Sequence, residues 1–507
     1  MSEIRKSEKR QLELFAELAT CNPFLPRRME LEKQVLGNDF EDDGIAWSRR
    51  LEFTDRERFN VTRLTDASIA LIKKVKEQAD AGKVVPEESL RHYWFVVIYA
   101  LLYRHIVYQA PENLRNPAST AAIWKEFLVD YRMLVKLPGL TEEITQSPAH
   151  VFAILCQLHR AFFNIYSFIL GESLPSIELR GKVWQSVFTS DIDRYRRSLF
   201  DRMRGIPSLI TGPSGTGKEL VARAIGLSQF IPFKEKQGYF HEENETSFFP
   251  LNLSALSENL IESELFGHRK GSFTGAIADR KGWLELCPAY GAVFLDEIGE
   301  LDPHLQVKLL RVVQQRNFSR LGDTKERKFS GKIVGATNRD LDEEMKAGRF
   351  REDLYYRLCA DRIETPGLRE QLNHRPDDLF FLTRHVAKRL AGDDSDSLCD
   401  QAVQWIETNL GPDYPWRGNF RELEQCVSSI MIRGQYIPGQ AQRSSDQVPW
   451  VSDAIKSKLT ADELLQRYCT WMYFQTGSYE AAARKLKIDR RTVKAKIDEA
   501  MLERLQS

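Results

Sequence analysis

The sequence predicts a multidomain protein with an all-α N-terminal domain, a central α/β domain with a helical lid, and a small all-α C-terminal domain. A chain of 507 residues exceeds the usual size of one domain. Its first third carries apolar residues at helical spacing, and from about residue 206 short apolar strands alternate with helices. These patterns place the domains at 1–175, 176–365, 366–435 and 453–507, with a linker at 436–452.

The composition is that of an ordinary globular protein, with 42% hydrophobic and 28% charged residues. Lys plus Arg and Asp plus Glu both total 72, so a polyanionic partner can only meet a local basic surface. The seven cysteines include no CxxC pair, which is typical of reduced thiols in a cytoplasmic protein. The most apolar run, YWFVVIYALLY at 93–103, is too short to span a bilayer, so we expect a buried helix and no membrane partner.

The N-terminal domain shows the helical period in three long segments, at 61–80, 89–109 and 149–170. It resembles no regulatory domain of a known type, so we expect a regulatory or sensory domain of unknown class. Four basic side chains lie in these apolar segments: Arg104, His105, His159 and Arg160. They could bind a ligand, but charges satisfied at helix edges are the favoured interpretation.

The central domain is predicted from short apolar segments that alternate with helical ones, at 206–210, 248–253, 291–296 and 332–337. This alternation is typical of a parallel sheet with crossover helices. From about 366 to 435 the pattern is helical again. Gly, Pro, Ser and Gln dominate 434–449 and indicate a linker.

The segment TGPSGTGKE at 211–219 lies between a predicted strand and a predicted helix, as a phosphate-binding loop requires. Glycines let backbone N–H groups face phosphate oxygens, and Lys218 adds a charge for the β and γ phosphates of ATP. Glu219 stands where Ser or Thr usually supplies a Mg²⁺ ligand, so the metal must be held elsewhere. The expected nucleotide contacts are Gly212, Pro213, Ser214, Gly215, Thr216, Gly217, Lys218 and Glu219.

A second acidic motif, GAVFLDEIGE at 291–300, ends a predicted buried strand. Open α/β sheets bind ligands at the carboxyl ends of their strands. Asp296 is therefore expected to hold Mg²⁺ and Glu297 to polarise the attacking water. Together with the phosphate-binding loop, this motif predicts an ATPase.

The order of six motifs resembles a known family. GPSGTGKE, ESELFGHRKGSFTGA, FLDEIGEL, GATNRDL, GRFREDLYYRL and WRGNFREL follow one another across 212–423. They look like the AAA+ domain of bacterial enhancer-binding proteins, which activate sigma-54 RNA polymerase. With the C-terminal unit included, the resemblance covers about 176–507.

The resemblance implies further site residues. Thr337 and Asn338 correspond to the sensor of the γ-phosphate, and Arg421 to a second sensor in the lid. Arg351 and Arg357 correspond to arginine fingers that a neighbouring subunit inserts, which implies a ring, a hexamer in this family. Asn252 corresponds to the asparagine that pairs with Glu297 as a switch.

The loop KGSFTGA corresponds to the family's contact with the sigma factor, and its flanking glycines allow it to rise and fold back. Ser272 stands where the family usually has Ala, and we expect an aromatic tip beside a hydroxyl. The expected contacts are Gly271, Ser272, Phe273, Thr274, Gly275 and Ala276. The connection at 228–253 is longer than usual. Its HEENE segment could bind a metal ion, but one His and several carboxylates on a polar loop favour a solvent-exposed surface.

The C-terminal segment 477–497 predicts a helix–turn–helix with a seam of small apolar residues. Its basic second helix could reach the major groove and phosphates of DNA. It resembles Fis-type DNA-binding domains, although Lys487 stands where Gly is preferred. The expected DNA contacts are Arg490, Arg491, Thr492, Lys494 and Lys496.

These expectations describe an ATP-dependent transcription activator that binds enhancer-like DNA and remodels sigma-54 RNA polymerase holoenzyme to allow open-complex formation. One alternative is an AAA+ remodeller of another protein, tethered to DNA. A second is a DNA-binding repressor with a decayed ATPase, which the intact catalytic motifs disfavour.

Overall fold

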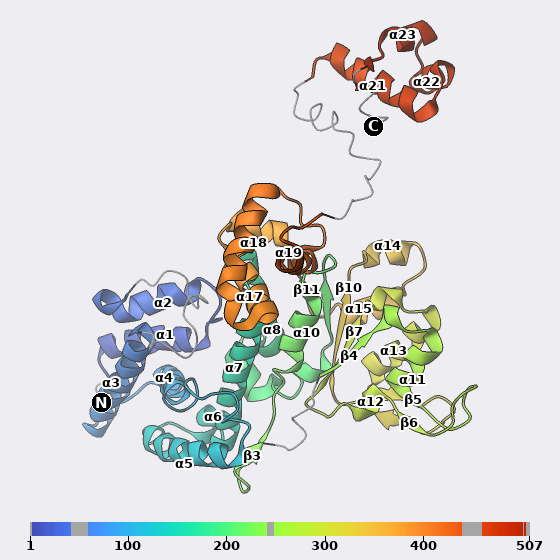
Figure 1. Ribbon diagram of the computed structural model, residues 1–507. Helices are drawn as coiled ribbons and strands as arrows, with labels where there is room; N and C mark the ends of the chain where they lie inside the picture. The colour runs from blue at the N-terminus through green and yellow to red at the C-terminus, as the bar shows by residue number, and fades with distance from the viewer. Residues whose placement is uncertain (1–2, 42–58, 241–247, 439–458, 500, 503–507) are drawn as a thin grey trace. The chain divides into compact units, whose positions relative to one another are not determined.

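The computed structural model describes residues 3–41, 59–240, 248–438, 459–499 and 501–502. It divides into two compact units, Met1–Tyr436 and Ile437–Ser507. The first unit contains the N-terminal helices, the α/β domain and its lid, and the described part of the second contains the helices α21, α22 and α23 (Figure 1). The whole HEENE segment, 241–245, and most of the predicted linker lie outside the described residues.

The N-terminal region is helical, as predicted. Its helices are α1 (Lys6–Thr20), α2 (Arg27–Leu36), α3 (Phe59–Asp80), α4 (Glu87–His105), α5 (Pro117–Leu134), α6 (Glu142–Thr145), α7 (Pro148–Phe168), α8 (Leu174–Phe188) and α9 (Ile192–Arg194). The apolar run at 93–103 belongs to α4, most of whose residues are buried among α1, α3, α5 and α7. Within the described parts of the chain, no helix has the length and apolar character that crossing a membrane requires.

The four basic side chains of these helices have protein partners. Arg104 and His105 both pair with Asp130, at 3.2 and 2.9 Å. Arg160 donates to the Gln229 carbonyl at 2.6 Å. Burial lowers the pKa of His159 to about 4, so its ring is neutral at physiological pH. Arg104 and His105 are thus paired within the protein, as the favoured interpretation expected. Arg160 makes a carbonyl hydrogen bond, although its Nε is buried without a partner in the structure. The neutral ring of His159 is hydrogen-bonded to the backbone of Val107.

The central domain contains a five-stranded parallel sheet in the order β11-β1-β10-β7-β4. Its strands are β1 (Ser208–Thr211), β4 (Phe248–Asn252), β7 (Ala292–Asp296), β10 (Lys332–Thr337) and β11 (Arg362–Glu364). The edge strand β11 was not predicted, because three residues with one apolar side chain carry too weak a pattern. All five carboxyl ends point to one edge, where the motifs of the sequence meet.

Helices and small hairpins complete the α/β domain. The helices are α10 (Lys218–Gly226), α11 (Glu258–Phe266), α12 (Trp283–Leu286), α13 (Pro303–Gln315), α14 (Leu341–Lys346) and α15 (Glu352–Leu358). The hairpins pair β2 (Phe233–Lys234) with β3 (Tyr239–Phe240), β5 (Gly267–His268) with β6 (Arg280–Lys281), and β8 (Asn317–Phe318) with β9 (Arg327–Lys328). The lid is helical, with α16 (Leu368–His374), α17 (Asp378–Ala391), α18 (Ser395–Asn409) and α19 (Asn419–Arg433).

The N-terminal helices and the α/β domain share one hydrophobic core. That core extends from α1, α4 and α7 to Val221, Ala224 and Ile225 of α10. The predicted division between 175 and 176 falls inside α8, which contacts both α7 and α10. The long connection at 228–253 forms the β2–β3 hairpin, whose Phe233 packs on Trp124 and Phe152 with ring centroids 4.9 and 4.8 Å apart.

In the described part of the second unit, α21 (Ala461–Thr476), α22 (Tyr479–Leu486) and α23 (Arg490–Ala495) pack together. Thr460 and Glu463 form a capping box at the start of α21. Lys487 adopts a left-handed conformation, with φ of 56°, between α22 and α23. The family preference for Gly at this position therefore has a conformational reason.

Candidate functional site

The phosphate-binding loop connects β1 to α10 and needs its glycines. Gly212, Gly215 and Gly217 have φ of 146°, 78° and 86°. A Cβ on Gly212 would lie 2.2 Å from Thr365 Oγ1, and one on Gly215 would lie 2.3 Å from the Gly418 carbonyl oxygen. The glycines thus permit both the path of the loop and the close approach of its neighbours.

Lys218 begins α10 and folds back over this loop. Its Nζ donates to the carbonyls of Gly212 at 2.9 Å and Pro213 at 3.1 Å. Burial lowers the pKa of Lys218, and the nearby carboxylates of Glu297 and Asp296 oppose that shift. The ammonium group is therefore held where phosphate oxygens could replace the two carbonyls.

Asp296 and Glu297 follow β7 directly. Burial raises the pKa of Asp296, and the neighbouring Glu297 carboxylate raises it further. Glu297 has a φ of 55°, and its Oε2 accepts a hydrogen bond from the backbone N–H of Asn338 at 3.1 Å. A backbone held in this sparsely populated region is frequent at functional sites.

Two neighbouring strand ends supply the predicted switch and sensor residues. Asn252 is in register with Asp296, and its Oδ1 accepts from Ser254 N at 3.0 Å and Ser254 Oγ at 2.8 Å. Among the described residues no hydrogen bond joins Asn252 to Glu297, so this pairing stays a prediction. Thr337 is buried, and Asn338 is exposed beside Glu297.

The lid closes over the phosphate-binding loop through the start of α19. Arg421 Nη1 donates to Ser214 Oγ and Asn419 Nδ2 donates to Ser214 O, both at 2.9 Å. Phe420 N donates to Gly215 O at 3.0 Å. The predicted lid arginine thus lies at the loop within its own chain, as a second sensor would.

A cavity of about 360 Å³ lies between this loop, the lid and the N-terminal helices. Lys218, Asp296, Glu297 and Arg421 line its polar side. Its apolar side comes from the end of α7, from α8 and from α17, with the side chains Phe168, Ile169, Leu170, Leu179, Leu382 and Val386. The volume and this division suit a flat base at one end and phosphates at the other.

The residues present fit ATP and Mg²⁺. The loop's backbone, Lys218 and the N-terminus of α10 would hold the phosphates. Asp296 is a half-buried carboxylate beside the carboxylate of Glu297. A bound divalent cation would offset the repulsion between these two negative charges. Glu219, which stands where Ser or Thr usually supplies a Mg²⁺ ligand, is exposed and forms a surface ion pair with Arg223 at 3.1 Å.

The predicted arginine fingers do not line this cavity. Arg351 precedes α15 and pairs with Asp353 at 2.8 Å. Arg357 is exposed on α15 and has no ion pair within the described part of the chain. Both positions leave the guanidinium groups on the surface, where a second subunit would have to meet them.

The loop predicted to contact a sigma factor lies on the β5–β6 hairpin. Gly271, Thr274 and Gly275 are exposed, and Ala276 is buried. Phe273 is half-buried, and its ring packs edge-on against His268 with centroids 5.0 Å apart, so its role as an aromatic tip stays a prediction. This contact shields part of the ring from water.

Ser272 lies in the crowded part of the loop. A Cβ placed on Gly322 would meet Ser272 Cβ at 2.8 Å, and Ser272 Oγ is buried without a hydrogen-bond partner in the structure. Ala, the usual residue of the family here, would fill the same space without an unpaired hydroxyl. Ile277, which the sequence analysis missed, is 83% exposed beside the loop.

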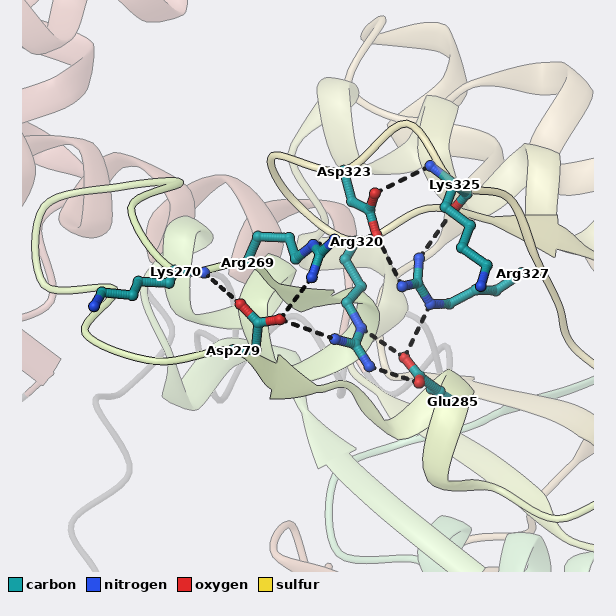
Figure 2. A network of polar contacts seen from close by, with 8 residues as sticks. All are labelled: Arg269, Lys270, Asp279, Glu285, Arg320, Asp323, Lys325 and Arg327. Atoms are coloured by element: carbon teal, nitrogen blue, oxygen red, sulfur yellow. Dashed lines mark hydrogen bonds and ion pairs between the residues drawn. The ribbon is translucent and has the colours of Figure 1, made fainter.

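A network of ion pairs ties the base of this loop to the β8–β9 hairpin (Figure 2). Asp279 accepts from Arg269 Nη1 at 2.9 Å and from Lys270 N at 2.8 Å. Glu285 pairs with Arg320 at 2.6 Å and Arg327 at 3.3 Å. The backbone joins the same segments, because Arg269 N donates to Leu321 O at 3.0 Å.

The second unit presents the predicted DNA-contact residues on and beside α23. Arg491, Thr492 and Lys494 are exposed, and none of them has an ion pair among the residues described. Arg490 pairs with Glu480 at 2.9 Å, and Lys496 with Asp462. Val493 is buried against Cys469, Ala482 and Ala483 and fixes which face of α23 is presented to solvent.

Three parts of the nucleotide site were missed by the sequence analysis. Asn419 lies inside the quoted WRGNFREL motif, which could have identified it. The hydroxyl groups of Thr365 and Thr216 are hydrogen-bonded, with their oxygens 2.7 Å apart. A single Thr after an edge strand has no sequence pattern that would identify it. The apolar lining at the end of α7 was assigned to the N-terminal domain, because only the tertiary structure brings it to the loop.

The fold and the site define a P-loop α/β domain with a helical lid, the architecture of an AAA+ ATPase domain. Residues 192–364 match the family model described as "Sigma-54 interaction domain". The central domain of this chain is therefore a sigma-54 interaction domain, which is an AAA+ ATPase domain, and the resemblance seen in the motifs is confirmed there.

Relatives are similar over the same region. The Nif-specific regulatory protein of Herbaspirillum seropedicae is 42% identical over 231 residues, which cover 45% of this chain and 39% of that protein. The transcriptional regulatory protein ZraR of Escherichia coli K12 is 38% identical over 304 residues, which cover 57% of this chain and 62% of that protein. NtrX of Brucella abortus, solved in complex with ATP, is 20% identical with a TM-score of 0.40, over 77% of this chain and 87% of NtrX. The chain thus spans between about two fifths and three fifths of the relatives it matches in sequence.

Proposed function

We propose that the chain hydrolyses ATP to remodel sigma-54 RNA polymerase holoenzyme and thereby allows open-complex formation at promoters. The observation that carries this proposal is that one sigma-54 interaction domain combines a GSFTGA loop with a cavity lined by Lys218, Asp296, Glu297 and Arg421. Homology to transcription regulators over that domain supports a role in transcription.

The chain's residues divide the work at the nucleotide site. The loop at 212–217 and Lys218 would bind and orient the phosphates, and Asp296 would hold Mg²⁺, whose charge would offset that of the phosphates. Glu297 orients a water molecule and withdraws its proton, with its position held by the Asn338 N–H. Arg351 and Arg357 complete the site of a neighbouring subunit in a ring, for which a hexamer is the family's form.

The output is the loop at 271–276. Asn252 and Asn338 lie on either side of Asp296 and Glu297, so a change at the γ-phosphate reaches both neighbouring strands. The hairpin network at Asp279 and Glu285 connects the loop to the segment that leads into β10. The second unit holds the chain at enhancer-like DNA through Arg490, Arg491, Thr492, Lys494 and Lys496.

The test is open-complex formation by the purified chain with sigma-54 holoenzyme and promoter DNA. We expect heparin-resistant complexes that require ATP hydrolysis, and their loss in Lys218→Ala. ATP hydrolysis without open complexes would instead favour the alternative, a remodeller of another protein tethered to DNA.

A further inference from the structure

A buried carboxylate of the lid joins α17 to the segment between α7 and α8. Asp378 begins α17 and is 0% exposed. Its two carboxylate oxygens accept a hydrogen bond from the backbone N–H of Glu172, at 3.1 and 2.9 Å, and one of them also accepts from that of Ser173 at 2.8 Å. Hydrogen bonds to an ionised acceptor are about twice as strong as those between neutral groups.

This carboxylate supplies a cap that the sequence of α8 lacks. The side chain of the N-cap residue Ser173 makes no capping hydrogen bond, and the first turn of α8 has no acidic residue. In a capping box the third helical residue is Glu or Gln and accepts the N–H of the N-cap residue. Here that residue is Ser176, and Asp378 of the lid accepts the N–H in its place. A negative charge at a helix N-terminus is also favoured by the helix dipole.

Two further polar contacts join the same parts of the chain. Ser176 Oγ donates to Gln371 Oε1 of α16 at 2.8 Å, and both side chains are buried. Arg375, which lies between α16 and α17, pairs with Glu172 at 2.9 Å. Because a buried polar group costs free energy when it loses its partner, these contacts favour one arrangement of the lid against α8.

Gly171 allows the two parts to approach closely. Its φ is 95°, and a Cβ there would lie 2.7 Å from Ser176 Oγ and 3.0 Å from Asp378 Oδ2. A side chain at this position would push the carboxylate away from the backbone N–H groups, so the contact requires glycine.

The parts joined in this way form the apolar wall of the nucleotide cavity. Leu170 and Leu179 come from the α8 side of the wall, and Leu382 and Val386 from the α17 side. Leu382 and Val386 follow Asp378 at a helical spacing, which places them on the same face of α17. The contact made by Asp378 therefore sets the separation between the two sides of the wall.

The lid has another attachment, at the phosphate-binding loop. Arg421 and Asn419 of α19 donate to Ser214 of that loop. Loss of the Asp378 contact would leave this attachment in place. The phosphate side of the cavity should then keep its geometry while the apolar side loosens.

We propose that Asp378 is a positioning residue for the nucleotide base, because it holds α17 against the start of α8 and keeps both sides of the apolar wall in place before ATP binds. A ligand binds more weakly when the binding-competent arrangement is only partly populated. The inference deepens the proposed function at its nucleotide site, on which it rests, and requires nucleotide binding but not remodelling.

The first test is calorimetric titration of the full chain with ADP and with inorganic triphosphate, both with Mg²⁺. Only ADP carries a base, so only ADP should depend on the apolar wall. Asp378→Asn keeps the size of the side chain but replaces one accepting oxygen by an amide group that donates. We expect the dissociation constant of ADP to rise about tenfold and that of triphosphate to change by less than about twofold.

The second test is the steady-state rate of ATP hydrolysis. In Asp378→Asn the KM for ATP should rise about tenfold and kcat should change by less than about twofold, because weaker binding of the base leaves the catalytic groups in place. A general loss of folded protein would lower the apparent kcat and leave KM unchanged.

Two further variants complete the comparison. Asp377→Asn is the matched control, because Asp377 is the exposed neighbour of Asp378 and makes no capping hydrogen bond. It should bind ADP as the parent does. Ser176→Ala removes a single hydrogen bond between α8 and α16 and should raise the dissociation constant of ADP about threefold. It decides the test if circular dichroism shows that Asp378→Asn is not folded.

An unchanged ADP affinity in folded Asp378→Asn would overturn the positioning role, and so would an equal loss of ADP and triphosphate affinity. A lowered kcat at an unchanged KM would overturn it as well. ADP binding that responds to Asp378→Asn in a chain that forms no open complexes would contradict the proposed function and leave the role of Asp378 standing.

Discussion

At the scale of single residues, the chemistry of the nucleotide site depends on side chains that hydrogen bonds to neighbouring groups hold in position. Glu297 is held by the Asn338 N–H at 3.1 Å, and Lys218 by two carbonyls of its own loop. These contacts are short-range and come from strand ends that lie next to each other in the sheet. Substitutions here should therefore change rates more than stability.

Glu297→Gln should keep nucleotide binding and lower ATP turnover by about 10²- to 10⁴-fold, because the amide cannot withdraw a proton from water. Phosphate release and the affinity for a fluorescent nucleotide measure the two effects. Glu300→Gln, three residues further on and paired with Arg339, is the control and should turn over normally. Equal turnover in both variants would remove Glu297 from the reaction.

Thr274→Ala should retain ATP hydrolysis and lose open-complex formation. Thr274 is exposed in the loop, so the substitution removes a hydroxyl that a partner could meet without disturbing the packed Phe273 or Ser272. Full open-complex formation by this variant would show that its hydroxyl is not part of the contact.

The buried side chain of Lys332 should make the free energy of unfolding depend on pH. It is 1% exposed in β10, donates to Ile206 O at 2.9 Å, and has a pKa that burial lowers to about 8. Between about pH 8 and 10.4 the unfolded lysine keeps a proton that the folded one has lost, so the free energy of unfolding should rise with pH.

Lys332→Met should abolish that rise and increase the free energy of unfolding at pH 7 by about 2 kcal/mol. Removing the buried ammonium group gains about 3 kcal/mol, which is the free energy equivalent of the pKa difference between the folded and unfolded chain. Leaving the Ile206 carbonyl without a donor costs about 1 kcal/mol of that gain. Urea unfolding of both proteins across this range measures the effect, and identical slopes would mean that Lys332 titrates as it does in water.

At the scale of elements, the β2–β3 hairpin explains the long connection after α10. Its aromatic residues pack into the N-terminal helices, where Phe233 lies between Trp124 and Phe152. The insertion thus joins the N-terminal helices to the α/β domain in one chain.

Phe233→Ala should lower the free energy of unfolding by about 3–5 kcal/mol, because it leaves a cavity in this aromatic cluster. Denaturant unfolding measures the change. Tyr356→Ala, at a side chain that is 67% exposed, should alter stability by less than about 0.5 kcal/mol. A loss at Phe233 no larger than that control would mean that the hairpin does not anchor the two parts.

At the scale of the whole molecule, the chain should divide near residue 436 and not near 175. The two units separate at Tyr436 and Ile437, whereas the N-terminal helices share a core with α10. A fragment of residues 1–436 should therefore hydrolyse ATP, and a fragment of residues 437–507 should fold and bind DNA.

A fragment that begins at residue 176 should expose the buried face of α10 and melt at a lower temperature or aggregate. Thermal denaturation and ATP turnover compare the fragments. A 176–436 fragment as stable and active as 1–436 would show that the shared core contributes nothing to the ATPase.

Most of the α/β domain could be predicted from the sequence, because its motifs are local. GPSGTGKE and GAVFLDEIGE each place their functional residues within a few positions of a strand end. The edge strand β11, Thr365 and the apolar lining at the end of α7 could not be predicted, because each depends on contacts between segments far apart in the chain.

The sequence by itself determined the helical N-terminal region, the ATPase motifs, the glycine-flanked loop and the helix–turn–helix, since local spacing encodes each of them. The tertiary structure alone decided that Phe273 packs against His268, that α8 crosses the predicted domain boundary, and that the end of α7 lines the nucleotide cavity. The physical reason is that burial and side-chain contacts between distant segments leave no periodic trace in the sequence.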